Sequence, residues 1–476
     1  MGWARCSPTL SRSRYDGIQI VNTQSDRKVP RDVIVVGGGF SGLLTAIEFS
    51  RRGISATVVE ASDQAGGVAR TVREDGYVLE PAAGTFLLPH PELSPLLHAA
   101  GVDLVESPST ARRRWAFRHG AMHELKDSPA IAFSPVLSWK AKFRTLREPW
   151  IHTPPPAEDE SLLHFACRRL GPETGQLIAN IMAHGVFAGD PSAMSARAAF
   201  AKLVALEDEA GSLIRGGIQR MRARPKGTPR ATAHTAPDGM ASVAQTLAEF
   251  LGDRYKGSWP VTSVHPEDDR WVVDGPERLT ADAIVIALAP AAAANIVPDD
   301  IAPLLGDRPT AKVAIIGLGG RASDMPIPPG FGFLTGPGES IHALGMLFES
   351  EYAANRAPDG CRMVKAIYGG DADPHIMRLS DDELLNTAID ELSLAIGTRV
   401  RPEFTRVVRQ ESGIPQYKIG HPAWLRQLDT ALVGHPGLQF TGWGYRGIGV
   451  SSLATDAVHV VDELTHHSSP AIGILP

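Results

Sequence analysis

Residues 32–42 read Asp-Val-Ile-Val-Val-Gly-Gly-Gly-Phe-Ser-Gly, and the fold prediction starts from this stretch. The run Asp32–Val36 is apolar and β-branched, which is typical of a strand buried in a parallel sheet. After the glycines, Leu43–Arg52 reads as a helix, and Ala56–Val59 reads as a second buried strand that ends at Glu60. A strand, a helix and a strand within about 30 residues form a βαβ unit. The sequence therefore predicts an α/β fold that opens with this unit.

Three glycines in the first turn have separate roles. Gly37 makes the tight turn off the strand, Gly39 lets the backbone approach a pyrophosphate, and Gly42 allows the helix to pack closely on the sheet. The helix N-terminus then presents free N–H groups and a positive dipole end to phosphates. Glu60 ends the second strand, where a carboxylate can bind ribose hydroxyls. The pattern predicts a dinucleotide site.

Two further glycine-rich segments indicate FAD rather than NAD. Asp63–Gly67 supplies a second glycine pair just after Glu60, and Gly442–Val450 precedes the last predicted helix. A ligand as long as FAD needs a second contact rich in backbone groups for its isoalloxazine end, where a helix N-terminus can stabilise negative charge on the reduced ring. Ser451 and Ser452 carry no thiol, so we expect the flavin to be held non-covalently.

The composition limits the class of protein. With 476 residues the chain should form at least two domains. The 47 Lys and Arg against 53 Asp and Glu give a net charge of -6, which argues against a nucleic-acid partner. No apolar run approaches the roughly 20 residues of a spanning helix, although peripheral membrane contact stays open. The three cysteines have no metal-like spacing, so we expect no metal site and a reducing, cytoplasmic setting.

Residues 1–31 show no periodicity, and we interpret them as a disordered leader. Arginines among serines in this segment leave a transit peptide as the alternative, so a mitochondrial location is the less favoured expectation.

The motifs resemble the FAD-dependent amine oxidase superfamily, and within it the protoporphyrinogen oxidase family. The specific matches are Gly185–Asp190 followed by Ser195, Phe331–Leu334, Ile414–Tyr417 with Gly420 and His421, and Tyr445–Val450. The resemblance implies a Rossmann-like FAD-binding domain interleaved with an α+β substrate domain that contains a helical insert. The FAD-binding domain would comprise residues 32–88, 232–298 and 408–466. The substrate domain would comprise 89–231, mainly helical, and 299–407, with a tail at 467–476.

The motifs and the resemblance together give the expected FAD-binding residues. They are Gly37, Gly39, Phe40, Ser41, Gly42, Glu60, Ala61, Gly66, Gly67, Val68, Ala82, Ala83, Gly84, Thr85, Val261, Gly442, Trp443, Ile448, Gly449 and Val450. The chain departs from the family pattern at three places near the expected flavin. Ala82-Ala83 stands where Gly-Pro is usual, Trp443 where Asn or Ala is common, and Gln410 where a tryptophan is usual.

The resemblance implies a six-electron oxidation of protoporphyrinogen IX, with hydride transfer to flavin and dioxygen as the final acceptor. The resemblance also implies that the helical part of the substrate domain contacts a membrane, as it often does in the family. Whether the protein forms a homodimer stays open. Phe331 and Phe333 are candidates for an apolar wall against a flat substrate, with plain core packing as the alternative. A non-enzymatic flavoprotein is a third hypothesis.

Lys312 is a tentative catalytic residue, because it begins an apolar strand that should cross beneath the cofactor. A buried, neutral amine there could position a water or assist an amine substrate. The alternative is that Lys312 points outward or pairs with an acid. The first reading keeps an amine or pyrroline-ring oxidase as the rival function.

Overall fold

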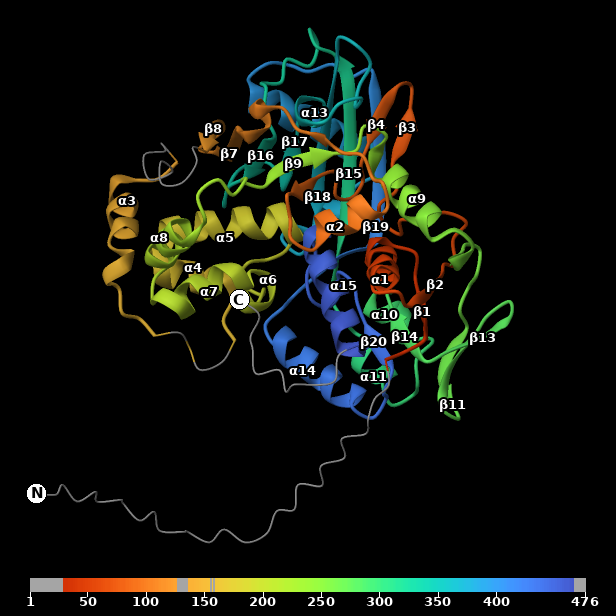
Figure 1. Cartoon of the computed structure of the whole chain (residues 1–476). Coiled ribbons are helices and arrows are strands. Elements are labelled where there is room, and N and C mark those ends of the chain that lie inside the picture. The colour runs from red at the N-terminus through yellow and green to blue at the C-terminus, as the bar shows by residue number, and fades with distance from the viewer. Residues whose placement is uncertain (1–28, 126–135, 155, 157–158, 466–476) are drawn as a thin grey trace, which may run out of the picture.

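The computed structural model describes residues 29–125, 136–154, 156 and 159–465. Nearly all of the predicted leader and the whole predicted tail lie outside the described residues. The chain folds into an α/β structure with two main sheets and a lateral group of helices (Figure 1). No helix in the described ranges is both long and apolar enough to cross a membrane.

A parallel sheet of five strands forms the base of the molecule, in the order β10-β2-β1-β14-β20. The strands are β1 (Asp32–Val36), β2 (Ser55–Val59), β10 (Tyr255–Lys256), β14 (Ala283–Ile286) and β20 (Leu438–Phe440). Val33 and Val35 face one apolar core, whereas Ile34 and Val36 face another, as expected of a strand buried on both sides. All five strands come from the three segments proposed for FAD binding.

Helices cover both faces of this sheet. α1 (Phe40–Arg51), α9 (Gly239–Leu251) and α15 (Val450–Thr465) share one core with it, and α1 packs directly against α15. The other face meets α14 (His421–Leu432) and two short helices, α10 (Pro290–Ala293) and α11 (Ala302–Leu305). The smaller strands around this part are β3 (Val72–Glu74), β4 (Tyr77–Leu79), β5 (Phe86–Leu88), β6 (Val105–Glu106), β9 (Thr232–Thr235), β11 (Ser263–Glu267), β12 (Arg270–Asp274) and β13 (Arg278–Ala281), with α2 (Leu93–Ala99) beside α1.

A second sheet has seven strands in the order β19-β15-β18-β17-β16-β7-β8. Its strands are β7 (Arg114–Arg118), β8 (Ala121–Leu125), β15 (Thr310–Arg321), β16 (Gly332–Thr335), β17 (Gly345–Leu347), β18 (Cys361–Gly369) and β19 (Phe404–Pro415). Residue 408, the expected start of the third FAD-binding segment, lies within β19, which pairs with β15 of this sheet. The division into two domains stays a proposal.

The two faces of the second sheet have different neighbours. Ala314, Ile316 and Leu318 share a core with α13 (Asp381–Ile396), which begins with a capping box at Ser380 and Glu383. Val313 and Ile315 on the opposite face share a smaller core with Tyr77 and Leu79 of β4. That face is therefore the one directed at the FAD-binding part.

The helical insert lies to one side of both sheets (Figure 1). It comprises α3 (Trp139–Leu146), the 3₁₀ turn η3 (Glu148–Trp150), α4 (Leu162–Leu170), α5 (Pro172–Phe187), α6 (Ala196–Ala199), α7 (Ala201–Ala210) and α8 (Leu213–Ala223). A buried ion pair between Arg169 and Glu148 joins α4 to η3, and Glu148 also accepts hydrogen bonds from Ser212 and the amide of Leu213. One carboxylate thus fixes the start of α8 against its neighbours.

Candidate cofactor site

The first turn requires glycine at two positions. Gly37 has a φ of +112°, donates its amide to Val59 O at 2.8 Å, and would bring a Cβ within 2.8 Å of Ala287 O. A Cβ on Gly42 would lie 1.9 Å from Gly37 O. The helix therefore packs so tightly on the turn that no side chain fits at either position.

Gly39 is different, because space rather than crowding surrounds it. A Cβ there would meet nothing closer than Gly67 Cα at 3.9 Å, and Gly39 caps α1 without a side-chain hydrogen bond. The second glycine pair closes on this turn, since Gly66 donates its amide to Gly38 O at 2.8 Å. Glu60 accepts from the amides of Gly38 and Ser62, which fixes its carboxylate at the end of β2. The backbone here fits a pyrophosphate and a ribose.

The remote glycine segment lies beside the start of α1. A Cβ on Gly442 would meet Ser41 Oγ at 3.5 Å, and Asp456 of α15 accepts from the amide of Gly442 and the hydroxyl of Thr441. Burial raises the pKa of Asp456. Farther along the turn, Gly449 has open space around it and is exposed. The two glycine segments therefore form one continuous cradle.

Three motifs from distant parts of the chain converge on this remote turn. Tyr417 donates its hydroxyl to Trp443 O at 2.6 Å and accepts from the amide of Gly447 at 2.8 Å. The Gln416 amide donates to Phe187 O at 2.7 Å, within the Gly185–Asp190 motif. The role of Ile414–Tyr417 is thus to join α5 to the glycine-rich turn.

A buried histidine supports the same clamp. His421 stacks on Tyr417 with ring centroids 4.1 Å apart, and its Nε2 donates to Tyr445 O at 2.8 Å. Desolvation lowers the pKa of His421 to about 4, so the ring is neutral near pH 7. It is a structural group, with no acid–base partner aimed at a substrate.

Other expected FAD-binding residues present exposed or half-buried surface. Val68 is 43% exposed, Ala61 and Ala83 are exposed, and Ala82, Thr85, Val261, Trp443 and Ile448 are half-buried. Phe40 stacks near Phe86, at a centroid distance of 6.1 Å, which brings the end of the Ala82–Thr85 loop to the first turn of α1. This surface would be covered by a cofactor bound along the cradle.

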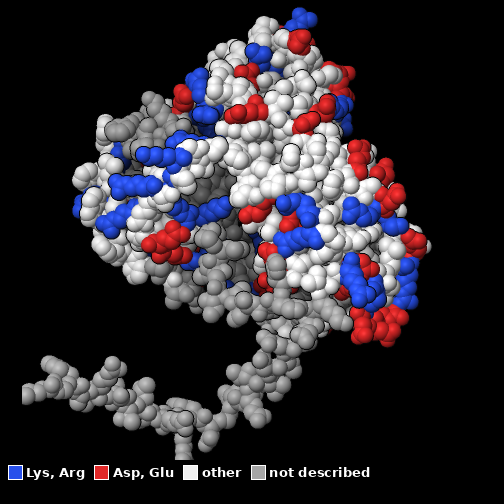
Figure 2. All heavy atoms as spheres, viewed as in Figure 1, with Lys and Arg blue, Asp and Glu red and all other residues white. Residues whose placement is uncertain are grey.

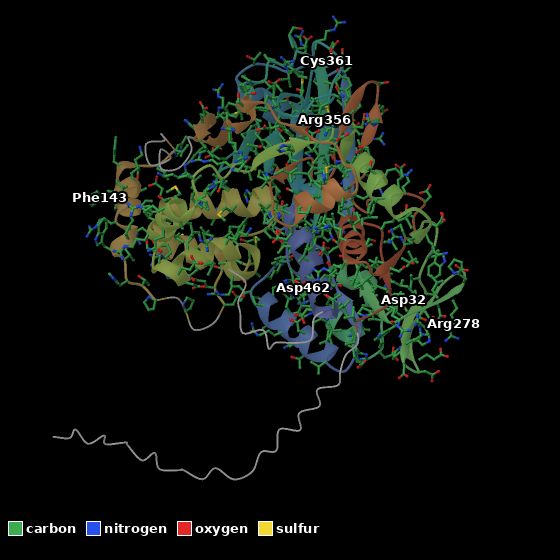
Figure 3. All side chains as sticks on the ribbon, viewed as in Figure 1. Asp32, Phe143, Arg278, Arg356, Cys361 and Asp462 are labelled. Carbon is green, nitrogen blue, oxygen red and sulfur yellow. The ribbon has the colours of Figure 1, made fainter. Side chains whose placement is uncertain are left out.

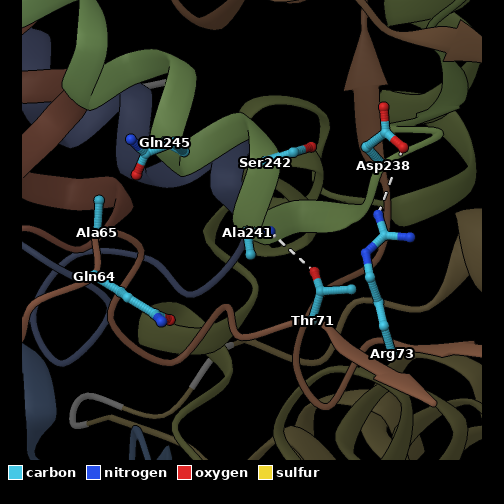
Figure 4. Close-up of a pocket in the computed structure, with 8 residues that line it drawn as sticks. All are labelled: Gln64, Ala65, Thr71, Arg73, Asp238, Ala241, Ser242 and Gln245. Atoms are coloured by element: carbon cyan, nitrogen blue, oxygen red, sulfur yellow. Dashed lines mark hydrogen bonds and ion pairs between the residues drawn. The ribbon is translucent and has the colours of Figure 1, made fainter.

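A polar pocket near Gly66 is separate from that cradle (Figure 4). Its lining residues are Gln64, Ala65, Thr71, Arg73, Asp238, Ala241, Ser242 and Gln245, none of which is among the expected FAD-binding residues. Thr71 Oγ1 accepts from the amide of Ala241 at 3.0 Å, and Arg73 lies 3.6 Å from Asp238. These contacts fix α9 against β3.

Phe333, a candidate for the substrate wall, takes the core position that the sequence left as its alternative. Phe333 is 1% exposed and lies on the α13 side of the sheet, packed near Phe117 and Phe348. Phe331 is half-buried and stacks on Tyr352 at 4.4 Å, with the Arg114 guanidinium 5.3 Å from its ring. Leu334 is the next residue of β16 and so faces the other side of the sheet. Its side chain is half-buried and lies against Gly185.

The tentative catalytic role of Lys312 does not fit the structure. Its side chain is 61% exposed, and Nζ pairs with Glu411 at 2.6 Å. The neighbouring Arg409 reaches Asp381 of α13, which shows that this row of β19 lies on the side away from the FAD-binding part. Lys312 therefore takes the outward, paired position that the sequence left as its alternative.

Sequence reasoning missed a different lysine. Lys365 of β18 is 2% exposed and pairs with Glu349 of the short helix α12 (Glu349–Tyr352) at 2.9 Å. Glu80 and Arg356 lie beside this pair, 3.7 Å apart and each 1% exposed. No motif marks these residues, because their positions in the chain show no spacing that would reveal a shared cluster.

The molecule is hollowed between the helical insert and the rest of the chain (Figure 2). Lys and Arg side chains gather over the insert beside this hollow (Figure 2). No cluster of three or more potential metal ligands occurs among the described residues.

The two glycine-rich turns, one after β1 and one before α15, lie on a parallel sheet and place the protein in the class of dinucleotide-dependent oxidoreductases. The model of the family "Flavin containing amine oxidoreductase" matches residues 40–450, and the chain belongs to this family. The protein is accordingly an FAD-dependent oxidoreductase.

Individual relatives are distant but nearly full-length. The chain is 24% identical to a coproporphyrinogen III oxidase of Bacillus subtilis, over 92% of this chain and 98% of the relative. It is 27% identical to protoporphyrinogen oxidase 1, chloroplastic, of Spinacia oleracea, over 92% and 85%.

Two solved structures share the fold. A crystal structure from Exiguobacterium sp. 255-15, named as a candidate protoporphyrinogen oxidase, has a TM-score of 0.75 and 22% identity, covering 91% of this chain and 98% of that one. Cyclohexylamine oxidase of Brevibacterium oxydans has a TM-score of 0.66 and 20% identity, covering 92% and 100%.

Proposed function

We propose that the protein oxidises a porphyrinogen with FAD as the non-covalently bound hydride acceptor and dioxygen as the final electron acceptor. Relatives named as coproporphyrinogen and protoporphyrinogen oxidases match over about nine-tenths of the chain, which supports this substrate class. The observation that carries the proposal is the convergence at Tyr417, where Ile414–Tyr417 joins the Gly185–Asp190 segment to the Gly442–Val450 turn.

Bound FAD supplies a two-electron acceptor to this site. The chain itself supplies position and electrostatics. Amides at the start of α1 would hold the phosphates, and the start of α15 would favour negative charge on the reduced ring. Val68 and Leu334 offer half-buried or exposed apolar surface that would exclude water beside a flat substrate. We assign no side chain as a catalytic base.

The test is aerobic incubation of the purified holoprotein with protoporphyrinogen IX and with coproporphyrinogen III, beside a panel of cyclic amines. Porphyrin fluorescence and hydrogen peroxide are recorded together. We expect porphyrin and peroxide from one or both porphyrinogens. Turnover of an amine alone would replace this proposal with the amine or pyrroline-ring alternative, and a yellow protein inactive on every donor would favour a non-enzymatic flavoprotein.

We also propose peripheral membrane contact through α3 and η3, for a protein otherwise in the cytoplasm. Trp139, Phe143, Leu146 and Trp150 are 78%, 63%, 57% and 68% exposed, and their spacing places them on one helical face. Residues 139–147 carry four Lys or Arg and no acid. Figure 3 shows Phe143 at the outer edge of the insert. Exposed aromatics with flanking cations suit an anionic lipid surface.

Co-sedimentation with anionic and with zwitterionic vesicles tests this contact. We expect binding to anionic vesicles that falls in a Trp139→Ser/Trp150→Ser variant and persists in Val433→Ser, a control at a residue 72% exposed on the end of α14. We also propose that the protein forms a homodimer. Size-exclusion chromatography with light scattering on the same preparation tests this proposal, and a monomer mass would remove it. A double variant that still sediments like wild type would remove α3 as the contact.

A further inference from the structure

The buried charges around Lys365 lie directly against the backbone of a cofactor loop. We propose that Lys365, assisted by Gln410, is a positioning residue that turns the amide groups of Ala82 and Ala83 toward the flavin and so raises its reduction potential. The inference rests on the proposed FAD contacts of the Ala82–Thr85 loop. It does not depend on which substrate is oxidised.

All three donors of the Lys365 ammonium are used inside the protein. Nζ donates to Glu80 O at 2.7 Å and to Ala82 O at 3.2 Å, and it pairs with Glu349 at 2.9 Å. A surface lysine would not be held in this way, because its ammonium would be hydrated. Here a cation 2% exposed is aimed at two backbone carbonyls of a single loop.

Gln410 binds the carbonyl of Pro81, which lies between the two carbonyls bound by Lys365. Its Nε2 donates to Pro81 O at 3.2 Å. Gln410 and Ala82-Ala83 are two of the three departures from the family pattern, and the structure places them in adjoining contacts. The chain thus lacks the rigid Gly-Pro of the family in this loop, and it has instead a side chain of β19, Gln410, that hydrogen-bonds to the loop.

The direction of the amides follows from peptide geometry. In a planar trans peptide the C=O and N–H groups point in opposite directions. Since Pro81 O and Ala82 O point at β19 and β18, the amides of Ala82 and Ala83 point away from that sheet. Among the described residues neither amide donates a hydrogen bond, and the side chain of Ala83 is exposed. Both amides are free to donate to a ligand.

The location of the loop agrees with that ligand being the flavin. Phe86, which follows the loop, begins β5, and β5 contacts α15, whose start is expected at the reduced ring. Amide donors at an isoalloxazine ring stabilise the negative charge of its reduced form, which raises its potential.

The surrounding charges keep Lys365 in place. Glu349 is fully buried, accepts from Tyr352 at 3.1 Å, and has one oxygen without a partner among the described residues. Glu80 accepts from the amide of Met240 at 2.9 Å and lies near Arg356. Two carboxylates balance two cations, so the cluster is neutral while one cation is directed at the loop.

The test compares Lys365→Met with Arg362→Met in the FAD-bound protein. Arg362 lies on the same strand and pairs with Glu351 of the same helix α12 at 2.9 Å, but its side chain is 36% exposed. We measure the flavin reduction potential by dye equilibration, and the hydrogen exchange of a peptide covering residues 82–85 with and without FAD. Porphyrinogen turnover is assayed separately.

We expect a negative shift of the potential in Lys365→Met and a loss of the FAD-dependent protection of residues 82–85, with neither change in Arg362→Met. If Lys365→Met does not fold, Lys365→Met/Glu349→Gln removes both buried charges and is measured in its place. Wild-type potential and wild-type protection in the lysine variant would overturn the proposal. A shifted potential in a protein that oxidises no porphyrinogen would leave it standing while refuting the proposed substrate.

Discussion

Replacing Tyr417 by phenylalanine should weaken both the fold and the binding of FAD. Tyr417 is 1% exposed, and its hydroxyl bridges Trp443 O and the amide of Gly447. Its removal leaves one acceptor and one donor unpaired, both in half-buried residues. Each unpaired buried group costs about 1–3 kcal/mol. Because the turn can relax, we expect a total loss of about 2–4 kcal/mol in the free energy of unfolding.

Part of that loss should appear in cofactor affinity, since the loosened turn is the one expected at the flavin. A loss of about 1.4 kcal/mol would weaken FAD binding by about tenfold. Urea unfolding of the apoprotein gives the first quantity, and flavin fluorescence during FAD titration gives the second. Tyr368→Phe is the matched control, because that buried tyrosine donates to Glu391 on the α13 side of the sheet. Unchanged FAD affinity in Tyr417→Phe, or equal weakening in both variants, would refute the clamp.

Three further outcomes follow from single residues. Gly42→Ala should abolish FAD uptake, seen as a colourless protein, because its Cβ would lie 1.9 Å from Gly37 O; a yellow variant would contradict the packing of α1. Lys312→Met should keep wild-type turnover, measured as porphyrin or peroxide formation, because Lys312 is 61% exposed and paired with Glu411; a large loss would restore the amine-oxidase mechanism. His421, with its pKa lowered from 6.5 to about 4, should make wild type lose stability as the pH falls from about 6.5 to about 4, by up to ~1.4 kcal/mol per unit. The unfolded state takes up the proton first, so stability is complete above about 6.5 and the loss levels off below about 4; urea unfolding of His421→Gln should lack this contribution, and an identical pH profile would contradict a neutral buried ring.

The sequence predicted the elements whose period or turn chemistry is local. β1 has the expected bounds, and β2 begins one residue before the expected strand and ends with it, because both strands are short apolar runs. The first glycine turn was equally readable, since Gly37 and Gly42 each answer a nearby steric need.

The orientation of Lys312 could not be predicted in this way. Alternation along β15 puts Lys312 on the face of Ala314, opposite Val313. The sequence does not say which of these two faces meets the FAD-binding part. Phe333 presented the same difficulty, because alternation alone does not say which face of a sheet meets the substrate. Lys365 lacked even a motif, since its partners, residues 80–82 and Glu349, come from two separate segments.

The contacts that Lys365 and Tyr417 make with backbone carbonyls have a common physical origin. A parallel sheet with its helices fixes the phosphate end of a dinucleotide through local backbone turns, but the Ala82–Thr85 and Gly442–Val450 segments leave their peptide groups unpaired by any ladder. Their geometry must then be set by side chains from elsewhere, and here Lys365 of β18 and Tyr417, which follows β19, supply it. Substitutions in the substrate sheet can therefore alter the environment of the flavin without touching the glycine turns. Because different residues set the two ends of the site, chains with one common fold can differ around the flavin while the glycine motif at the phosphates stays recognisable in the sequence.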